Sequence, residues 1–501
     1  MLLRKKEKQH RKSGNMAIRS LPAIPSPHSV IKFWARKPLS LIMNEIPHHA
    51  KILDPFCGSG TAGLASVFRG SSALLSDLNP VSVFITWNLL NKYQFSEYVL
   101  AETEYVLKEV ENEVYKVHDE VLDYAVWTNN YICKRCGGNV PYETIRIEKP
   151  ACKTCRSRLC FDEIEITEKV IELRTVSGRG FKRYTSRRLL KDYREGEENL
   201  KIRNWHPSGT LIYPRTNRIF REVRRWRTLR IEELFTKRGL SAASKVYEYI
   251  EDVCNKHPEE GDLLKLVFIA SLVSATKMIP HCLSSGPSWK IPRYWIPHLR
   301  EERNFIRSFR RRLHRLKDYK DVWLKKAKDY DFYFLNDLTD FQWSQKSVGV
   351  ARSDARKVEV SSPVDLVILD PPHFNEIHYF ELFYVWQRWL QGKHNDLRFA
   401  DYNYWNQEID VNPNAGRNEE YYIKEISYLV SKYLSFLRRH GELLLILHHS
   451  DKNVLDRSLK QIKDTAFCDF SVRSSVPLVP SSAQGLHKKP KRLYLAKIVP
   501  K

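Results

Sequence analysis

Residues 54–70 read DPFCGSGTAGLASVFRG, a glycine-rich turn that runs directly into an apolar segment with helical spacing. The preceding AKIL, residues 50–53, is a short apolar run typical of a buried strand. A glycine turn between a strand and a helix N-terminus lets backbone N–H groups approach a ligand closely. The stretch therefore predicts a strand, a ligand-binding turn and a helix, the first unit of a doubly wound α/β sheet.

The same alternation continues on both sides of a long interruption. SALLSD, residues 72–77, predicts a second strand, and PVSVFITWNLL, residues 80–90, predicts a helix that begins with proline. Strand-like runs return after about residue 330, among them VDLVIL at 364–369 and GELLLILHHS at 441–450. We therefore expect an α/β protein with one Rossmann-type sheet that is split by a long insertion. The expected parts are a basic flexible arm at 1–27, the first half of the sheet domain at 28–100, a cysteine-bearing insertion at 101–215, a helical, basic region for nucleic-acid recognition at 216–330 and the second half of the sheet domain at 331–501.

The composition indicates a polyanionic partner. The chain has 501 residues, a formal net charge of +24 and a pI near 9.5. Such an excess of basic residues usually accompanies nucleic acid. No apolar run is long enough to span a bilayer, and no apolar segment follows the basic N-terminus as it would in a secretory signal. We expect a cytoplasmic protein that binds nucleic acid, with duplex DNA favoured, and that does not associate with membranes.

The glycine turn matches a nucleotide site only in part. Gly58, Gly60 and Gly63 have the G-x-G-x-x-G spacing of a dinucleotide turn. Asp77 ends the next strand, where a ribose would bind. A carboxylate at Asp54 would repel a pyrophosphate, but it can accept hydrogen bonds from the ammonium group of an amino-acid cofactor. The alternative is a purely structural turn, with Asp77 as an ordinary acid at a strand end.

The segments DPFCGSGT and SDLNP resemble the first and second motifs of the amino-methyltransferases that use S-adenosylmethionine. The resemblance implies that S-adenosylmethionine is the cofactor and that the acid of the second motif accepts both ribose hydroxyls. It also suggests that Asp337, which follows another strand-like run, lies near the adenine amine, and a solvated loop acid is the alternative. The cofactor-binding residues expected on this basis are Asp54, Phe56, Gly58, Gly60, Thr61, Asp77 and Asp337.

A second stretch, VILDPPHF at 367–374, places an Asp-Pro-Pro sequence directly after a buried strand. An exocyclic amine on a nucleobase is a poor nucleophile because its lone pair is delocalised into the ring. A carboxylate and a main-chain carbonyl, held by two stiff prolines, can accept both amine hydrogens and localise that lone pair. The expected catalytic residues are Asp370, Pro371, Pro372 and His373.

His373 departs from the pattern of the family, which normally carries an aromatic residue that stacks on a flipped base at this position. An imidazole can also stack, and it would add pH sensitivity. A loop histidine in the wall of a pocket is the alternative.

FWARKP, residues 33–38, resembles a segment that precedes the cofactor turn in adenine-specific DNA methylases containing a zinc ribbon. ELFTKRGL at 233–240 and NEIHYFELFYVW at 375–386 also have counterparts in that family. The resemblance implies methyl transfer to N6 of adenine in duplex DNA, with the target base flipped out, as in restriction–modification systems. Lys37 and Pro38 would start a helix beside the cofactor, or be a surface lysine and the first residue of an ordinary helix.

Four cysteines have metal-ligand spacing. Cys133 and Cys136 form one C-x-x-C pair, and Cys152 and Cys155 form a second pair after fifteen intervening residues. Four thiolates close a tetrahedral site, so the pattern predicts a zinc ribbon with structural zinc. The metal would stiffen an insertion too small to bury its own core. An iron–sulfur cluster is the alternative metal centre, and Cys160 is an alternative ligand.

Two further segments are candidates for nucleic-acid contact. The basic helical segment 303–328 can follow phosphates, and a solvated charged face is its ordinary interpretation. GPSWKIPRYW at 286–295 contains Trp289, Lys290, Arg293 and Trp295, which can face a groove or stack on bases. Three other functions stay open at this stage: a tRNA or rRNA guanine-N2 methyltransferase, a DNA cytosine-N4 methyltransferase, and a catalytically silent nucleic-acid binder.

Overall fold

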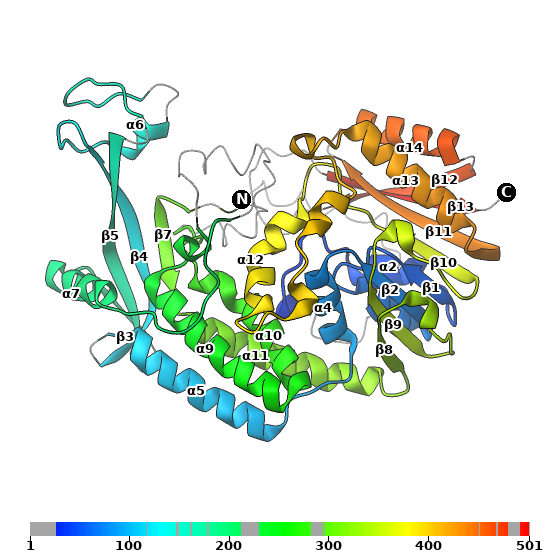
Figure 1. Ribbon diagram of the computed structural model, residues 1–501, viewed down its shortest axis with the longest axis horizontal. Helices are drawn as coiled ribbons and strands as arrows, with labels where there is room; N and C mark the ends of the chain where they lie inside the picture. Colours follow the sequence, from blue (N-terminus) through cyan, green and yellow to red (C-terminus); the bar gives the residue numbers. More distant parts are fainter. Residues whose placement is uncertain are drawn as a thin grey trace, which may run out of the picture.

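An eight-stranded, mostly parallel sheet forms one half of the protein, on the right of Figure 1. Its strands lie in the order β12-β13-β11-β10-β1-β2-β9-β8. Strand β13 runs antiparallel to β11 and β12, whereas the other neighbours pair in parallel. The strand bounds are β1 Lys51–Asp54, β2 Ser72–Asp77, β8 Asp331–Leu335, β9 Ser347–Arg352, β10 Val364–Leu369, β11 Leu437–His449, β12 Asp469–Leu478 and β13 Lys491–Val499.

This computed structural model describes residues 27–117, 119–146, 150–160, 163–177, 180–211, 230–281, 294, 296–449, 451–466, 469–478 and 491–499. The expected arm at 1–27, except for its last residue, lies outside the described residues. So do the four residues singled out in the segment 286–295, namely Trp289, Lys290, Arg293 and Trp295.

The strand order reverses between β1 and β10. From β1 the sheet continues through β2 to β9 in one direction, and through β10 to β11 in the other. Open α/β sheets bind ligands outside the carboxyl ends of the strands at such a reversal. The expectation of an α/β protein is confirmed at the level of a mixed fold with a mostly parallel sheet.

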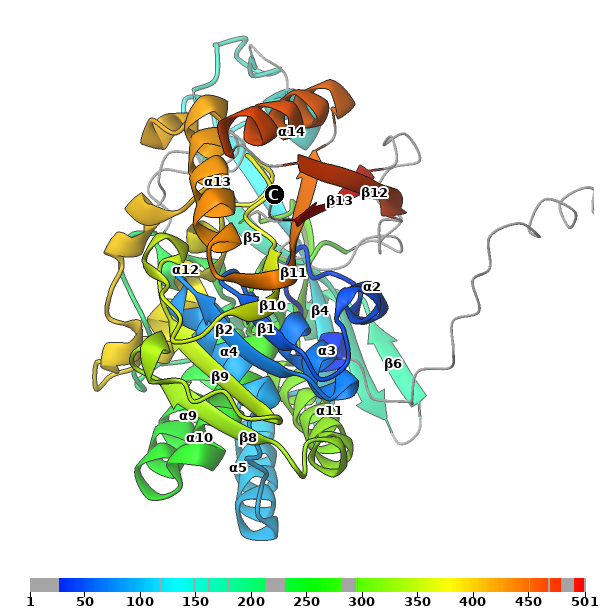
Figure 2. The same ribbon diagram turned by 90° about the vertical axis from the view of Figure 1, so that its right-hand side faces the viewer.

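Both faces of the sheet are buried because apolar side chains alternate along its strands. Ile52 of β1 and Ile368 of β10 belong to one core, whereas Leu53 and Leu369, their neighbours in sequence, belong to another. Helices α13 and α14 cover the second core, beside β11 in Figure 2. The helix bounds around the sheet are α1 Pro27–Val30, α2 Leu39–Glu45, α3 Thr61–Arg69, α4 Pro80–Leu90, α12 Tyr379–Gln391, α13 Glu419–Leu434 and α14 Lys452–Ala466.

The helical part of the insertion packs directly against the sheet domain. Its main helices are α5 Glu97–Tyr115, α9 Lys237–Lys256, α10 Pro258–Ser271 and α11 Phe305–Lys326. Tyr319 Oη and Trp323 Nε1 of α11 donate hydrogen bonds to the last carbonyls of α4, at 3.0 and 2.7 Å. A single hydrophobic core runs through these helices and the adjoining face of the sheet. The two parts are therefore joined by buried side chains.

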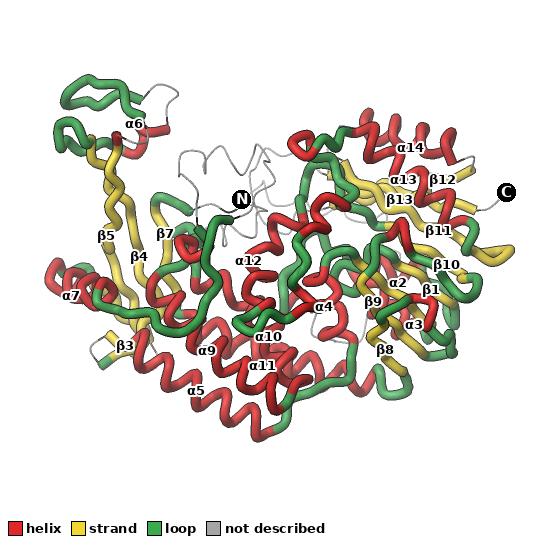
Figure 3. The backbone as a smooth tube through the Cα atoms, in the orientation of Figure 1, coloured by secondary structure: helices red, strands yellow, loops and turns green. Residues whose placement is uncertain are grey.

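Two long antiparallel strands form an arm that projects away from the sheet domain, on the left of Figures 1 and 3. They are β4 Glu120–Cys133 and β5 Ile164–Ser177. The short strands along them are β3 Lys116–Val117, β6 Gly180–Tyr184 and β7 Leu299–Arg303, and the adjoining helices are α6 Tyr142–Arg146 and α7 Arg187–Glu198. Helix α6 lies at the tip of the arm, beside the loops that carry the paired cysteines.

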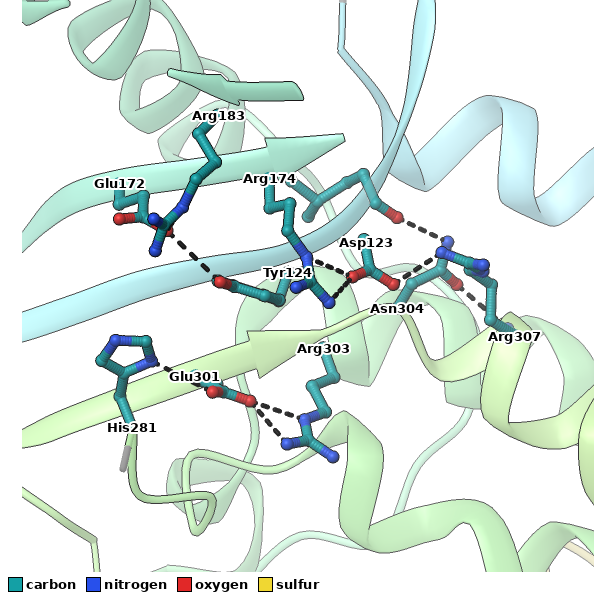
Figure 4. A network of polar contacts seen from close by, with 11 residues as sticks. Asp123, Tyr124, Glu172, Arg174, Arg183, His281, Glu301, Arg303, Asn304 and Arg307 are labelled. Atoms are coloured by element: carbon teal, nitrogen blue, oxygen red, sulfur yellow. Dashed lines mark hydrogen bonds and ion pairs between the residues drawn. The ribbon is translucent and has the colours of Figure 1, made fainter. Parts of the chain in front are cut away.

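A polar network fastens the base of the arm to α11 (Figure 4). Asp123 of β4 accepts hydrogen bonds from Arg307 of α11 at 2.6 Å and from Arg174 Nε of β5 at 2.7 Å. Asn304, the N-cap of α11, donates to the carbonyl of Leu122 at 2.9 Å. Because one carboxylate bridges arginines from a strand and a helix, the arm is anchored at its base.

None of the described helices is both long and apolar enough to cross a membrane.

Candidate functional site

An open cavity of about 970 Å³, including space that opens to solvent, lies at the carboxyl ends of the central strands. Asp54 ends β1 and Asp77 ends β2, and both line the cavity. Asp370 directly follows β10 and Asp354 follows β9, and these two also line it. Four strands thus deliver four carboxyl groups to one space at the reversal of strand order.

The glycine turn forms part of the cavity wall and requires glycine. Gly58 and Gly60 have φ of +54° and +77°, in the left-handed region that favours glycine. A Cβ on Gly58 would lie 3.1 Å from Cε1 of Phe33, and one on Gly60 would lie 3.0 Å from Cγ2 of Thr86. The turn is therefore pressed closely between two neighbouring segments.

The structure brings together most of the residues expected to bind a cofactor. Those that line the cavity are Asp54, Phe56, Gly58, Thr61 and Asp77. Gly60 does not line the cavity and is the N-cap of α3.

Asp337 lies apart from this group. It follows the edge strand β8, is exposed, and accepts hydrogen bonds from the backbone N–H and hydroxyl of Thr339 at 2.8 and 2.7 Å. It does not line the cavity. Asp354 does so, because β9 and not β8 lies next to β2. The expected position of Asp337 near the other cofactor residues thus differs from the position in the structure.

The Asp-Pro-Pro-His segment forms a tightly held loop after β10. Asp370 and Pro372 line the cavity, whereas Pro371 and His373 are buried beside it. The carbonyl of Pro372 accepts hydrogen bonds from Tyr422 Oη at 2.8 Å and from the Phe374 N–H at 3.1 Å. Phe374 has φ of +45°, which costs an L-residue about 1–2 kcal/mol. The fold holds this loop in a conformation that its sequence does not favour.

The segment FWARK, residues 33–37, connects the two halves of the site. Phe33 packs on Phe383 of α12 with ring centroids 5.4 Å apart, and Trp34 packs on Trp386 at 5.3 Å. Arg36 Nε donates to Ser59 Oγ of the glycine turn at 2.7 Å. This segment therefore joins the helix that follows the Asp-Pro-Pro loop to the turn that follows β1.

Lys37, the last residue of this segment, is buried at the Asp-Pro-Pro loop. Its Nζ lies 2.7 Å from both carboxylate oxygens of Asp370 and 3.1 Å from Nε2 of His373. The side chain of Lys37 is only 5% exposed, so the alternative of a surface lysine is wrong. Sequence reasoning did not pair the two residues, because 333 positions separate them. The sole signal was the resemblance carried by FWARKP.

Burial governs the charges of the cavity. It raises the pKa of Asp54 and Glu408 well above the ordinary range and that of Asp77 to about 7. Burial also raises the pKa of Asp370, while the ammonium group of Lys37 opposes that rise. Two of the four strand-end carboxyl groups are ion-paired, Asp370 with Lys37 and Asp354 with Arg356, each at 2.7 Å. A cationic group of a ligand would favour the ionised form of the remaining two, Asp54 and Asp77.

Arg36 supplies positive charge in the lining of the same cavity. Its two terminal nitrogens are buried and have no hydrogen-bond partner within the described part of the chain. Burial lowers the pKa of its guanidinium to about 10. Buried charged donors normally have partners, so this group fits an anionic ligand group in the cavity that it lines. Sequence reasoning did not single out Arg36.

The four paired cysteines meet at the tip of the arm. The Sγ atoms of Cys133, Cys136, Cys152 and Cys155 all lie within 4.8 Å of one another. Cys160 does not belong to this cluster. The cluster can therefore hold one metal ion, as the spacing predicts.

The two cysteine loops have matching geometry. In the first, the Gly137 N–H donates to the Cys133 carbonyl, and in the second the Arg156 N–H donates to the Cys152 carbonyl, each at 2.8 Å. Gly137 and Arg156 both have left-handed φ, +69° and +60°. Hydrogen bonds from Ser157 lower the pKa of the Cys155 thiol to about 6, which favours the thiolate that metals bind.

The basic helix expected at 303–328 is α11, and part of its charge serves the fold. Arg310 pairs with Glu104 and Glu111, and Arg312 donates to the carbonyls of Ser29 and Val30. The basic residues of α11 that remain exposed are Arg311, Arg315, Lys325 and Lys326.

No model of a known protein family matches the chain, and no curated protein sequence matches it.

Proposed function

We propose that the protein is an S-adenosylmethionine-dependent methyltransferase that methylates the N6 amine of adenine in duplex DNA. The observation that carries this proposal is the single cavity lined by the glycine turn, by Asp77 and by Asp370. One cavity thus combines a proposed cofactor site, after β1 and β2, with a proposed acceptor for an amine, Asp370, after β10. The resemblance of the sequence motifs to amino-methyltransferases supports the same conclusion.

The chemistry of the cavity fits this cofactor. S-adenosylmethionine carries an ammonium and a sulfonium group, and the cavity gathers several carboxyl groups. S-adenosylmethionine also carries a carboxylate. Arg36 offers two buried nitrogens that have no hydrogen-bond partner within the described residues. We propose that Asp77 accepts the ribose hydroxyls, Arg36 binds the carboxylate and Asp54 faces the ammonium group. We propose Asp354, whose carboxylate is ion-paired with Arg356, for the position near the adenine that the sequence suggested for Asp337.

The bound cofactor would supply a methyl group on a sulfonium. In the transfer, the amine nitrogen would form a bond to the methyl carbon while the S–C bond breaks and sulfur keeps the electron pair as a thioether. The nitrogen would then release a proton. Asp370 accepts a hydrogen bond from the amine and localises the nitrogen lone pair. The same carboxylate would accept the released proton. The prolines and the Tyr422 hydrogen bond keep the loop rigid, so that little reorganisation is needed.

We further propose that the four-cysteine cluster binds zinc in a structural role. All four ligands are protein thiolates, which leaves no position for a substrate or water. The cluster lies at the far end of a two-stranded arm, where few apolar residues are buried. Metal binding would supply the folding energy that so small a core lacks.

Exposed basic residues support nucleic acid as the partner. The two cysteine loops present Lys134, Arg135, Lys153, Arg156 and Arg158, all of them exposed. Basic groups on an anchored arm can contact phosphates away from the target base. Such contacts give affinity without sequence specificity.

The test combines purified protein, isotopically labelled S-adenosylmethionine and separate samples of unmethylated duplex DNA and tRNA. Nucleoside digestion and mass spectrometry then identify the labelled base. We expect N6-methyldeoxyadenosine from DNA, and loss of the label in Asp370→Ala with cofactor affinity kept within a few-fold.

Asp337→Ala is the matched control, because it removes an acid at the end of a neighbouring strand but outside the cavity. It should keep wild-type activity. Label in tRNA guanine or in N4-methylcytosine would replace the adenine proposal. Full activity of Asp370→Ala would refute the catalytic assignment, and bound cofactor without transfer to any substrate would indicate a silent nucleic-acid binder.

A further inference from the structure

We infer that Lys37 is a positioning residue of the reaction: it holds the Asp370 carboxylate in place and couples it to His373. This inference rests on the proposed function, because Asp370 is the group that would accept the amine. It assigns a role to a residue that comes from the other end of the chain.

Lys37 Nζ lies at the centre of a group of polar contacts. Two Asp370 oxygens at 2.7 Å, His373 Nε2 at 3.1 Å and the Ala35 carbonyl at 3.2 Å surround it. An ammonium group carries only donors, so the imidazole nitrogen that faces it is the acceptor. The contact therefore selects the tautomer of His373 that carries its proton on Nδ1.

The residues that meet at Lys37 Nζ come from two segments with unusual backbone conformations. Ala35 has φ of +55°, two residues before Lys37, and Phe374 has φ of +45°, directly after His373. Each conformation costs an L-residue about 1–2 kcal/mol. Such conformations persist only where surrounding contacts hold them, and they gather at functional sites. Here the aromatic contacts of Phe33 and Trp34 with α12 hold the first segment.

Lys37 also changes the charge of the site. Asp370 lies where burial raises its pKa, and the lysine ammonium lowers that pKa again. The ionised carboxylate offers only acceptors and is the stronger acceptor for an amine hydrogen, whereas the protonated form uses one oxygen as a donor. Each carboxylate oxygen has two lone pairs, so the ion pair leaves acceptor positions for an amine. Lys37 thus keeps Asp370 competent without occupying all its acceptor capacity.

His373 takes a different role in this arrangement from the stacking role that the family pattern suggests. Its side chain is only 5% exposed, and its ring lies against His448 with centroids 5.2 Å apart. The buried His373 ring contacts Lys37 and His448, so it supports the Asp-Pro-Pro loop from the protein interior. The inference therefore places His373 with Lys37 in the support of Asp370, away from the target base.

The test compares Lys37→Met, which removes the charge at similar length, with Lys37→Arg, which keeps it. We expect Lys37→Met to lower kcat by 100-fold or more at neutral pH while cofactor Kd stays within a few-fold. The acidic limb of its kcat profile should move to higher pH by about 1–3 units. Lys37→Arg should restore much of kcat and return that limb toward its wild-type position.

The pH profile must be assigned among the groups that face Asp370. Those groups are Asp54 from β1, His373 from the loop, Tyr379 from α12, Tyr422 from α13, His448 from β11 and Lys37 itself. A second measurement that needs no turnover isolates Asp370. Without Lys37 the folded protein holds the Asp370 proton more tightly than the unfolded chain does, so stability falls as pH rises. The unfolding midpoint of Lys37→Met should therefore fall, relative to wild type, as the pH rises above the ordinary pKa range of an aspartate, and adding Asp370→Asn should remove that trend.

Lys320→Met is the matched control, because Lys320 of α11 is another buried lysine. Its Nζ donates to the side-chain and backbone oxygens of Asn91, each at 2.8 Å. Lys320→Met should leave the acidic limb of kcat unchanged. If the wild type is active and Lys37→Met has the wild-type kcat and the wild-type acidic limb, the inference on Lys37 is overturned and the proposed function stands. If the wild type transfers no methyl group to any substrate, the proposed function fails, and the inference fails with it.

Discussion

The backbone N–H of Gly58 donates a hydrogen bond of 3.0 Å to Oδ2 of Asp77, 19 positions further along the chain. The other carboxylate oxygen accepts the N–H of Asn79 at 2.9 Å. These two bonds fix the acid of the second motif against the glycine turn of the first. Two motifs that are separate in the sequence thus form one wall of the cavity.

The first prediction concerns the pH dependence of cofactor binding. Burial raises the pKa of Asp77 to about 7, although the two N–H donors oppose that rise. The ionised carboxylate would be the stronger acceptor for both ribose hydroxyls, because charge-assisted hydrogen bonds are stronger than neutral ones. About a tenth of a group with this pKa is ionised one unit below it, and about nine tenths one unit above. Calorimetry should therefore find the affinity for S-adenosylmethionine about tenfold higher at pH 8 than at pH 6.

The control for this prediction is Asp77→Asn, in which the titrating group is absent. Its affinity should be lower than that of wild type at pH 8 and should vary much less between pH 6 and 8. An unchanged pH dependence in Asp77→Asn would assign the effect to another carboxyl group of the cavity, such as Asp54.

The sequence predicts the central strands well because each is buried on both faces. Strands β1, β2 and β10 are short apolar runs bounded by turn residues, and β11 contains the apolar run LLLIL at 443–447, a pattern that needs no tertiary information. The glycine turn and the paired cysteines are equally local signals. Asp54, Asp77 and Asp370 could therefore be placed at strand ends, and the cysteines placed in one cluster, from spacing alone.

Strand order and long-range contacts could not be predicted in this way. Asp337 and Asp354 both follow strands, and only the order β2-β9-β8 brings one to the cavity and leaves the other at the edge. Strand β9 reads SVGVAR, a short run with an internal glycine that gives a weak strand signal. The roles of Arg36 and Lys37 depend on partners in the turn and in the Asp-Pro-Pro loop. Neither partnership leaves a periodic pattern.

The second prediction tests the unpartnered guanidinium. If Arg36 binds the cofactor carboxylate as proposed, replacing it by Met removes a charged donor worth about 1.5–3 kcal/mol. Calorimetry should show an affinity for S-adenosylmethionine about ten- to a hundredfold lower. The unfolding midpoint of the cofactor-free protein should change little, because the loss of the Nε bond to Ser59 is offset by the removal of two buried donors that have no partner within the described residues.

Arg312→Met is the control for Arg36, since Arg312 is also partly buried but donates to the carbonyls of Ser29 and Val30, outside the cavity. It should leave the cofactor affinity unchanged. An Arg36→Met protein that binds the cofactor as tightly as wild type would exclude the carboxylate role.

The third prediction concerns the metal. Elemental analysis of the purified protein should find about one zinc per chain, because the cluster offers four thiolates. Cys155→Ser should lose most of the metal, whereas Cys160→Ser should retain it, since Cys160 is exposed and outside the cluster. The cluster lies at the tip of the arm, so loss of zinc should leave cofactor affinity unchanged. A metal-free protein with a folded arm would contradict the structural role of zinc.

The fourth prediction tests the rigidity of the Asp-Pro-Pro loop through Tyr422→Phe. The ring of Tyr422 packs on Phe374 with centroids 4.4 Å apart, and this contact is kept in the variant. Only the 2.8 Å hydrogen bond to the Pro372 carbonyl is lost, at a cost of about 0.5–1.5 kcal/mol in stability. That carbonyl keeps the Phe374 N–H as a donor, so the loop loosens without unfolding. We expect kcat to fall several-fold because the Asp370 carboxylate is less well positioned, with cofactor Kd unchanged. Weaker cofactor binding at unchanged kcat would show instead that Tyr422 supports the cofactor side of the cavity.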